Sequence, residues 1–142
     1  MKIGILSDTH DQTINIETAI QILKKYSIQK LFHCGDVTSL ASLELISEYP
    51  LALTFGNGDF MTGEMREFIL SNNPENSVGY QYHGECFGKK IGMTHSHLIG
   101  VLDEMIDSQI FDYVFFFFFY LRSNHKIGRS CVIIPGSLGW LK

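Results

Sequence analysis

The sequence predicts a mixed α/β fold, and three observations support this prediction. Apolar runs suited to buried strands alternate with segments of helical period through residues 2–59. After the polar stretch SNNPENS the pattern changes to that of a hairpin. No internal repeat and no linker-like stretch divides the 142 residues, so we expect one domain over residues 1–142.

The first half of the chain should form parallel strands joined by helices. The predicted strands are residues 2–7, 30–34 and 51–55, and the predicted helices are residues 13–26 and 39–48. The first helix has an apolar stripe from Ile14 to Leu23, and Ser39 can cap the second. This alternation implies right-handed crossovers between neighbouring strands.

The second half should contain both hairpin and crossover connections. We expect a helix at 63–70, a loop at 71–77, and a hairpin at 79–95 that turns near Gly84 or Gly88. A helix at 98–110, an apolar strand or strand pair at 111–121, and a last strand at 130–139 should follow. The run Phe115–Phe119 lies in an apolar stretch about half the ~20 residues that a membrane-spanning helix needs. As a central strand it could pack on both faces, although five phenylalanines overfill most cores.

Composition narrows the class of protein. Hydrophobic residues make up 45% and charged residues 18% of the chain, which is typical of a folded globular protein. The net charge of −4 argues against a basic nucleic-acid-binding surface. No secretory signal precedes the first strand, and the three cysteines show no CxxC spacing, so we expect reduced thiols and a cytoplasmic protein.

Polar residues cluster directly after four of the predicted strands. The clusters are Asp8 with His10, Gly35 with Asp36, Gly56 to Asp59, and His95 with His97. Side chains two apart in an extended segment point the same way, so Asp8 and His10 should project together. A single such residue is usually a turn former, but four clusters in register predict one site at the carboxyl ends of the strands.

The residue types suit a metal centre. Asp8, His10, Asp36, Asn57 and His95 offer the mixed oxygen and nitrogen donors that manganese, iron or zinc accept. A carboxylate shared by two cations, such as Asp36, would hold them about 3.5–4 Å apart. Such a pair would acidify a bound water and shield the charge of a phosphoryl group.

Four motifs in order, SDTH, HCGD, GNGD and THSH, closely resemble those of the calcineurin-like metallophosphoesterases. The likeness spans nearly the whole chain, includes PGS at residues 135–137, and is greatest to small single-domain phosphodiesterases of bacteria and archaea. The retromer phosphoesterase-like subunit belongs to the same group. The resemblance implies a four-layer α-β-β-α sandwich with a two-metal site at one end, shortened here at the C-terminus.

The resemblance also implies a role for each motif residue. Asp8 and His10 would hold one metal, Asp36 would bridge both, and Asn57 and His95 would hold the other. The catalytic residues would include Asp59, which orients the ligands, and His97, which lines the substrate pocket. The cofactors would be two divalent ions, manganese in the first place, with iron, zinc or nickel possible. Gly58 replaces a proton-donating histidine of other branches, which favours substrates with good leaving groups.

One family motif is missing. Relatives close the site with GHTH, and those positions fall here on Phe117 to Tyr120, so each cation would keep three protein ligands. Tyr120 or His125 could substitute, but a packed tyrosine and a solvated loop histidine are the default expectations. His33 on a buried strand should be a core histidine, and His83 carries no signal.

The leading hypothesis is therefore a metal-dependent phosphoesterase with weakened metal binding, acting on phosphodiesters or small phosphomonoesters. Its partners would be a small phosphorylated substrate, with no nucleic acid and no membrane, and a second copy could cover the sheet edge as a homodimer. The alternative is a catalytically degenerate scaffold of the same fold that binds other proteins. That alternative is motivated by FFFY in place of GHTH and by apolar surface around Trp140.

Overall fold

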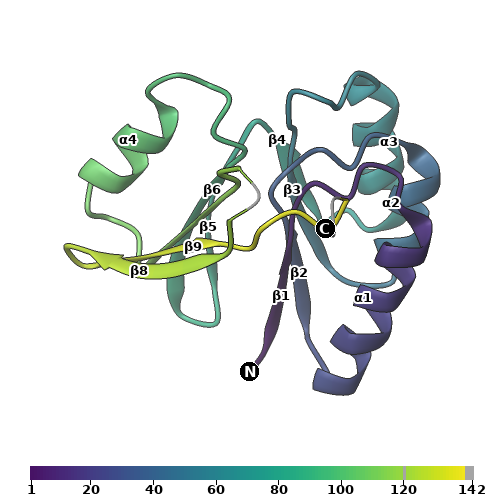
Figure 1. Ribbon diagram of the computed structural model, residues 1–142, viewed down its shortest axis with the longest axis horizontal. Helices are drawn as coiled ribbons and strands as arrows, with labels where there is room; N and C mark the ends of the chain where they lie inside the picture. The colour runs from purple at the N-terminus through teal and green to yellow at the C-terminus, as the bar shows by residue number, and fades with distance from the viewer. Residues whose placement is uncertain (120, 140–142) are drawn as a thin grey trace.

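Two β-sheets lie face to face, and helices cover the outer face of each (Figure 1). The structure is a computed structural model that describes residues 1–119 and 121–139. The four-stranded sheet has the order β1 (Ile3–Leu6), β2 (Lys30–His33), β3 (Leu51–Thr54) and β4 (Ser77–Gly79), with all neighbours parallel. The five-stranded sheet has the order β5 (Gln81–Cys86), β6 (Lys89–Thr94), β7 (Tyr113–Phe116), β9 (Ser130–Ile134) and β8 (Ser123–Ile127).

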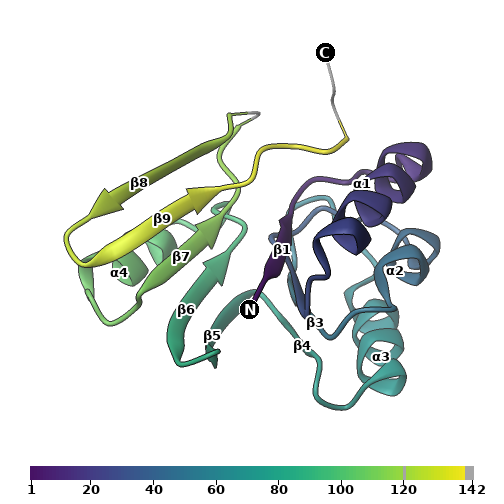
Figure 2. The same ribbon diagram turned by 90° about the horizontal axis from the view of Figure 1, so that it is seen from below.

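The helices complete a four-layer sandwich. They are α1 (Thr13–Tyr26), α2 (Leu40–Ile46), α3 (Thr62–Asn72) and α4 (Val101–Asp107). The first three cover the parallel sheet and α4 covers the mixed sheet, as two perpendicular views show (Figures 1 and 2). The predicted α-β-β-α architecture is confirmed.

The layer between the sheets is rich in aromatic side chains. Phe32 of β2 packs edge-to-face against Phe115 of β7 and Tyr82 of β5, with ring centroids 5.3 and 5.6 Å apart. Phe32 and Phe115 are fully buried. These contacts join strands that are distant in the sequence, so they fix how one sheet sits on the other.

Local sequence signals explain several element boundaries. The Ser39 hydroxyl accepts the N–H of Ser42 at 3.2 Å, which confirms the predicted cap of α2. The β5–β6 hairpin turns at Phe87 and Gly88, whose φ angles of 52° and 73° are typical of a two-residue turn. Of the two turn positions considered from the sequence, Gly88 is therefore the right one.

Other predictions were wrong in detail. The apolar stripe predicted for α1 is narrower, because Ile16 and Ile20 are buried while Ile14 and Ile22 are exposed. β4 lies in the stretch predicted as loop and hairpin, and β8 was not predicted. β8 is a polar edge strand hydrogen-bonded to β9, so it lacks the apolar alternation that marks a half-buried strand.

The phenylalanine run is divided between core and surface. Phe115 and Phe116 end β7 and are buried, whereas Phe118 and Phe119 are 47% and 64% exposed. β7 ends at Phe116, and the side chains of Phe118 and Phe119 lie outside the core, so the core is not overfilled. Among the described residues, no helix is long and apolar enough to cross a membrane. Tyr120 and Trp140 lie outside the described residues.

Candidate metal centre

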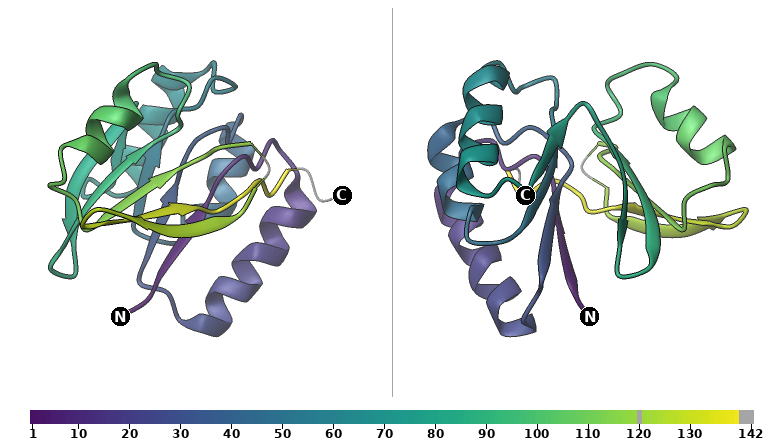
Figure 3. Two further views of the ribbon diagram at one scale, coloured as in Figure 1. Left: turned by 60° about the vertical axis from the view of Figure 1, so that its left-hand side comes forward. Right: turned by 180° about the vertical axis from the view of Figure 1, so that it is seen from behind.

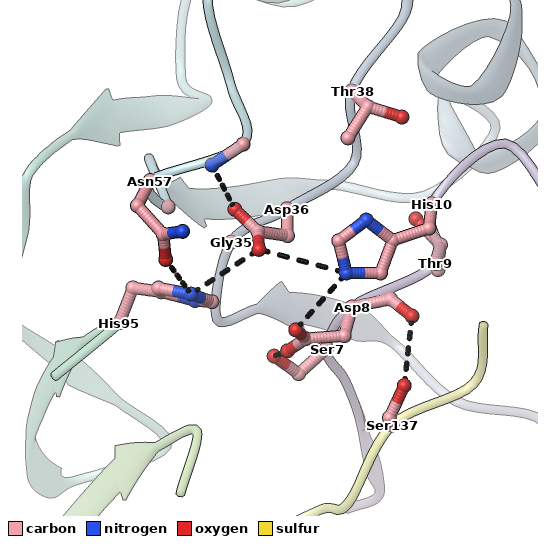
Figure 4. Close-up of polar contacts among 12 residues, drawn as sticks. Ser7, Asp8, Thr9, His10, Gly35, Asp36, Thr38, Asn57, His95 and Ser137 are labelled. Atoms are coloured by element: carbon pink, nitrogen blue, oxygen red, sulfur yellow. Dashed lines mark hydrogen bonds and ion pairs between the residues drawn. The ribbon is translucent and has the colours of Figure 1, made fainter. Parts of the chain in front are cut away.

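The loops that follow β1, β2, β3 and β6 bring all five predicted ligands together (Figure 4). His10 Nε2 lies 3.3 Å from Asp8 Oδ1 and 3.6 Å from Asp36 Oδ2. His95 Nε2 lies 3.5 Å from Asp36 Oδ2 and 3.2 Å from Asn57 Oδ1. The donors thus form two groups of three that share Asp36 between them.

Asp8 and His10 meet for a different reason from the one predicted. β1 ends at Leu6, and Asp8 and His10 have φ angles of 51° and 41°, so this segment is not extended. Asp36 is also left-handed, with φ of 58°. Such angles cost a non-glycine residue on the order of 1–2 kcal/mol each. Two backbone hydrogen bonds hold the strained turn, from the Asp8 N–H to the Gly35 carbonyl and from the His10 N–H to the Asp36 carbonyl.

The hydrogen bonds of His95 define which ring nitrogen faces the site. Its Nδ1 donates to the Cys34 carbonyl at 2.6 Å, so Nε2 of the neutral ring carries the lone pair. That lone pair faces Asn57 Oδ1 and Asp36 Oδ2, which are also acceptors. Three acceptor atoms that converge need a positive charge between them, which either a proton on Nε2 or a divalent cation with N and O ligands supplies.

Burial and neighbouring charges shift the pKa values of three residues in the site. Burial raises the pKa of Asp8 to about 6, against the opposing hydrogen bond from Ser7. Burial would also raise the pKa of Asp36, but the hydrogen bond and charge of His95 outweigh it and hold that pKa below its usual value. The same partnership raises the pKa of His95 against the effect of its burial. Asp36 is therefore an anion at neutral pH.

Asp59 ties two of the loops together beneath the donors. Its Oδ2 accepts the N–H of Asp36 at 2.9 Å and the N–H of Gly56 at 2.8 Å. Its Oδ1 accepts the N–H of Thr38 at 2.8 Å. The carboxylate is buried, so it positions the loops after β2 and β3 rather than facing solvent.

Two glycines are required where side chains approach the backbone. A Cβ on Gly35 would lie 2.6 Å from His95 Nδ1, and the residue has φ of 106°. A Cβ on Gly56 would lie 2.1 Å from Asp36 Oδ1. Both positions exclude any side chain, because the imidazole and the carboxylate fill that space.

The late PGS motif braces the first loop. The Ser137 hydroxyl and the Gly139 N–H both donate to the Asp8 carbonyl, at 3.2 and 2.6 Å. The Leu138 N–H donates to the Ser7 carbonyl at 3.1 Å. Sequence reasoning matched the motif but did not predict this contact, and it missed Ser7, whose hydroxyl donates to Asp8 Oδ2.

A cavity of about 450 Å³ adjoins the donors on the side of His95. His97 is among its lining residues, and His97 Nδ1 is buried with no hydrogen-bond partner among the described residues. That His97 lines a substrate pocket stays a prediction. The Phe117 ring stacks on the His95 ring, with centroids 5.3 Å apart and planes 11° apart. Sequence reasoning treated Phe117 only as the loss of a motif position and missed this packing role.

The remaining histidines do not join the donors. His33 is a buried core histidine, as predicted: its Nδ1 accepts the Gly35 N–H and its Nε2 donates to the Thr9 hydroxyl, both at 3.2 Å. His125 is exposed but lies on β8 rather than in a loop. His83 on β5 packs against Phe111.

We expect His33 to make the fold sensitive to acid. Burial lowers the pKa of its imidazole from 6.5 to about 3, so below pH 6.5 the unfolded chain takes up a proton that the folded chain does not. The free energy of unfolding should therefore fall by about 2 kcal/mol more in the wild type than in His33→Gln between pH 7 and pH 5. Urea unfolding in EDTA at pH 7 and pH 5 gives the change in the free energy of unfolding for each protein. An equal change in the wild type and in His33→Gln would contradict this prediction.

The fold and the donor set together define a class: four-layer α/β proteins that gather carboxylates and imidazoles at the ends of their strands. The chain belongs to the calcineurin-like phosphoesterase superfamily, whose domain profile matches residues 1–142.

Individual relatives agree with this assignment. The phosphodiesterase MJ0936 of Methanocaldococcus jannaschii is 33% identical over 138 residues, which are 96% of this chain and 83% of that protein. A solved archaeal phosphodiesterase superimposes with a TM-score of 0.92 at 33% identity, covering 99% of this chain and 87% of that one. Vps29 of Entamoeba histolytica, solved with zinc, has a TM-score of 0.71 at 15% identity over 96% of this chain and 74% of that one. The last likeness shows the fold alone.

Proposed function

We propose that residues 1–142 form one metal-dependent phosphodiesterase domain that binds two divalent cations. The observation that carries this proposal is the pair of donor groups sharing Asp36, in which His10 and His95 approach the same carboxylate oxygen at 3.6 and 3.5 Å. Bound cations would lower the pKa of a water and neutralise the phosphoryl group in the negatively charged site. Manganese is the metal we propose, because it accepts this mixture of oxygen and nitrogen ligands.

The chain's own residues orient the site for this reaction. The Gly58 N–H donates to Asp36 Oδ1 at 2.6 Å, which leaves Oδ2 facing both imidazoles (Figure 4). His97 lies beside His95, with ring centroids 5.5 Å apart, and its imidazole lines the cavity, where it can hydrogen-bond a substrate oxygen. Gly58 offers no proton to a leaving group, so esters of acidic alcohols and phenols should react fastest.

We also propose that metal binding is weaker than in relatives with GHTH. Asp8, His10 and Asp36 would hold one cation, and Asp36, Asn57 and His95 the other, so each keeps three protein ligands. Phe117 faces His95 with an aromatic ring, which cannot ligate a hard or borderline cation. The expected consequence is a need for added metal in solution.

The test is hydrolysis of an aryl phosphodiester, bis(4-nitrophenyl) phosphate, by EDTA-treated protein. We expect release of nitrophenol to be absent in EDTA and to rise with added manganese until it saturates. Parallel titrations with zinc, nickel and iron rank the metals. A rate that is equal with and without metal would contradict the proposal.

A protein-binding scaffold of the same fold is the second candidate. The loss of both GHTH histidines and the exposed side chains of Ile99, Phe118 and Phe119 favour it. Metal titration calorimetry discriminates the two, since a scaffold without function at the site need not bind two cations.

We propose a cytoplasmic setting, because Cys34 and Cys86 are buried free thiols, and a homodimer stays a prediction.

A further inference from the structure

Building on the proposed phosphodiesterase function, we infer that the site selects phosphoesters carrying a flat aromatic group. The side chains of Phe118 and Phe119 would hold that group in the cavity beside His95. We call these two side chains the aromatic shelf. The inference concerns the ester group of the substrate, whereas the proposed function concerns the phosphoryl group.

The cavity joins the donor groups to the aromatic shelf. Asn57 and His95 belong both to the donors and to the cavity lining, and Phe118 and Phe119 belong to the same lining. The two phenyl rings of the shelf meet edge-to-face, with centroids 4.7 Å apart. A substrate with its phosphoryl group at Asn57 and His95 therefore extends its ester group toward these rings. Volumes near 450 Å³ are within the range of small-molecule sites.

The lining favours an uncharged and apolar ester group. Among the described residues that line the cavity there is no lysine or arginine, and Asp103 is the one with an acidic side chain. A polyphosphate or carboxylate tail would meet no cation there and would be repelled by Asp103. Leu98, Ile99 and Leu102 add aliphatic surface to the same wall.

Without an occupant in the cavity, much of the apolar surface of the aromatic shelf is exposed to water. Phe118 is 47% exposed, Phe119 is 64% exposed, and Ile99 is fully exposed. A flat ring in the cavity would remove part of this apolar surface from water and could stack or pack edge-to-face on the phenyl groups. An aliphatic group would bury a similar area but would not gain the ring–ring geometry.

The test uses phosphonates, because their P–C bond is not hydrolysed and leaving-group chemistry does not enter. We expect manganese-loaded protein to bind phenylphosphonate about tenfold more tightly than methylphosphonate by calorimetry. Cyclohexylphosphonate should bind more weakly than phenylphosphonate. Adenosine 5′-monophosphate is an additional probe, and tighter binding than methylphosphonate would indicate that a nucleobase is the natural aromatic group.

Variants of the aromatic shelf test whether its two side chains cause the preference for phenylphosphonate over methylphosphonate. Phe118→Ala and Phe119→Ala should each reduce the phenyl-over-methyl ratio about three- to tenfold, and Phe118→Tyr should retain it. Phe87→Ala is the matched control, because Phe87 is 46% exposed, similar to Phe118, and lies in the β5–β6 turn. Circular dichroism checks that each variant is folded.

Failure of the inference and failure of the function give different results. Equal binding of phenylphosphonate and methylphosphonate, or of phenylphosphonate and cyclohexylphosphonate, would overturn the aromatic preference even if the diester is hydrolysed. A ratio unchanged in both alanine variants would overturn the role of the shelf. A shelf-dependent phenyl preference without any hydrolysis would instead support the aromatic site and remove the proposed catalysis.

Discussion

Asp36→Asn is expected to lower manganese-dependent hydrolysis of the aryl phosphodiester by at least about a hundredfold. Asp36 is the residue that both donor groups share, with His10 Nε2 and His95 Nε2 near its Oδ2. The amide keeps the size of the side chain and can still accept the Gly58 N–H through its oxygen. It removes the negative charge that two cations would share, so both metal sites should weaken together.

Two measurements make this result specific. Calorimetry should show loss of manganese affinity in Asp36→Asn, while urea unfolding in EDTA checks that the fold is intact. Asp107→Asn removes a carboxylate from the exposed end of α4 and should leave both rate and affinity unchanged. Wild-type affinity and rate in Asp36→Asn would show that the shared carboxylate is not a metal ligand.

Asp59→Ala should give the largest loss of stability. The buried carboxylate accepts three backbone N–H groups, from Asp36, Thr38 and Gly56. Truncation leaves these donors with no partner, and each buried unsatisfied group costs about 1–3 kcal/mol. We expect the free energy of unfolding to fall by about 3 kcal/mol or more in urea titrations performed in EDTA.

Asp112→Ala is the control for this effect. Asp112 also accepts a backbone N–H, from Lys90 at 2.8 Å, but at an exposed place where water can replace the carboxylate. We expect a much smaller change there. Similar losses in the two variants would mean that burial of the Asp59 hydrogen bonds does not decide their contribution.

The convergence of the donor side chains was predicted better than the local backbone geometry that produces it. Asp8, His10, Asp36, Asn57 and His95 each follow an apolar strand directly, so strand patterning and parallel order suffice to bring them to one edge. The local geometry was not predictable in the same way. Asp8 and His10 come together through left-handed backbone angles, and their hydrogen bonds reach residues of the next strand loop.

Which phenylalanines of the run are buried was also not predictable from the local sequence. Phe115 and Phe119 have identical side chains and stand at the two ends of one run of phenylalanines, yet one is fully buried and the other is 64% exposed. The difference arises because Phe115 meets Phe32 of the opposite sheet, while the chain has left the sheet before Phe119. The position of the opposite sheet therefore decides which phenylalanines are buried and which are exposed.

The sequence by itself determined the α/β class, the order of most elements, and the residues that supply the donors. It could do so because apolar periodicity and the residues that follow a strand are local properties of the chain. Figure 3 shows from two further sides how the two sheets and their outer helices are stacked. Only the tertiary structure decided the polar edge strand β8, the brace from Ser137 to Asp8, and the aromatic wall beside His95. Each of these depends on contacts between segments far apart in the chain, and no local pattern encodes such a contact.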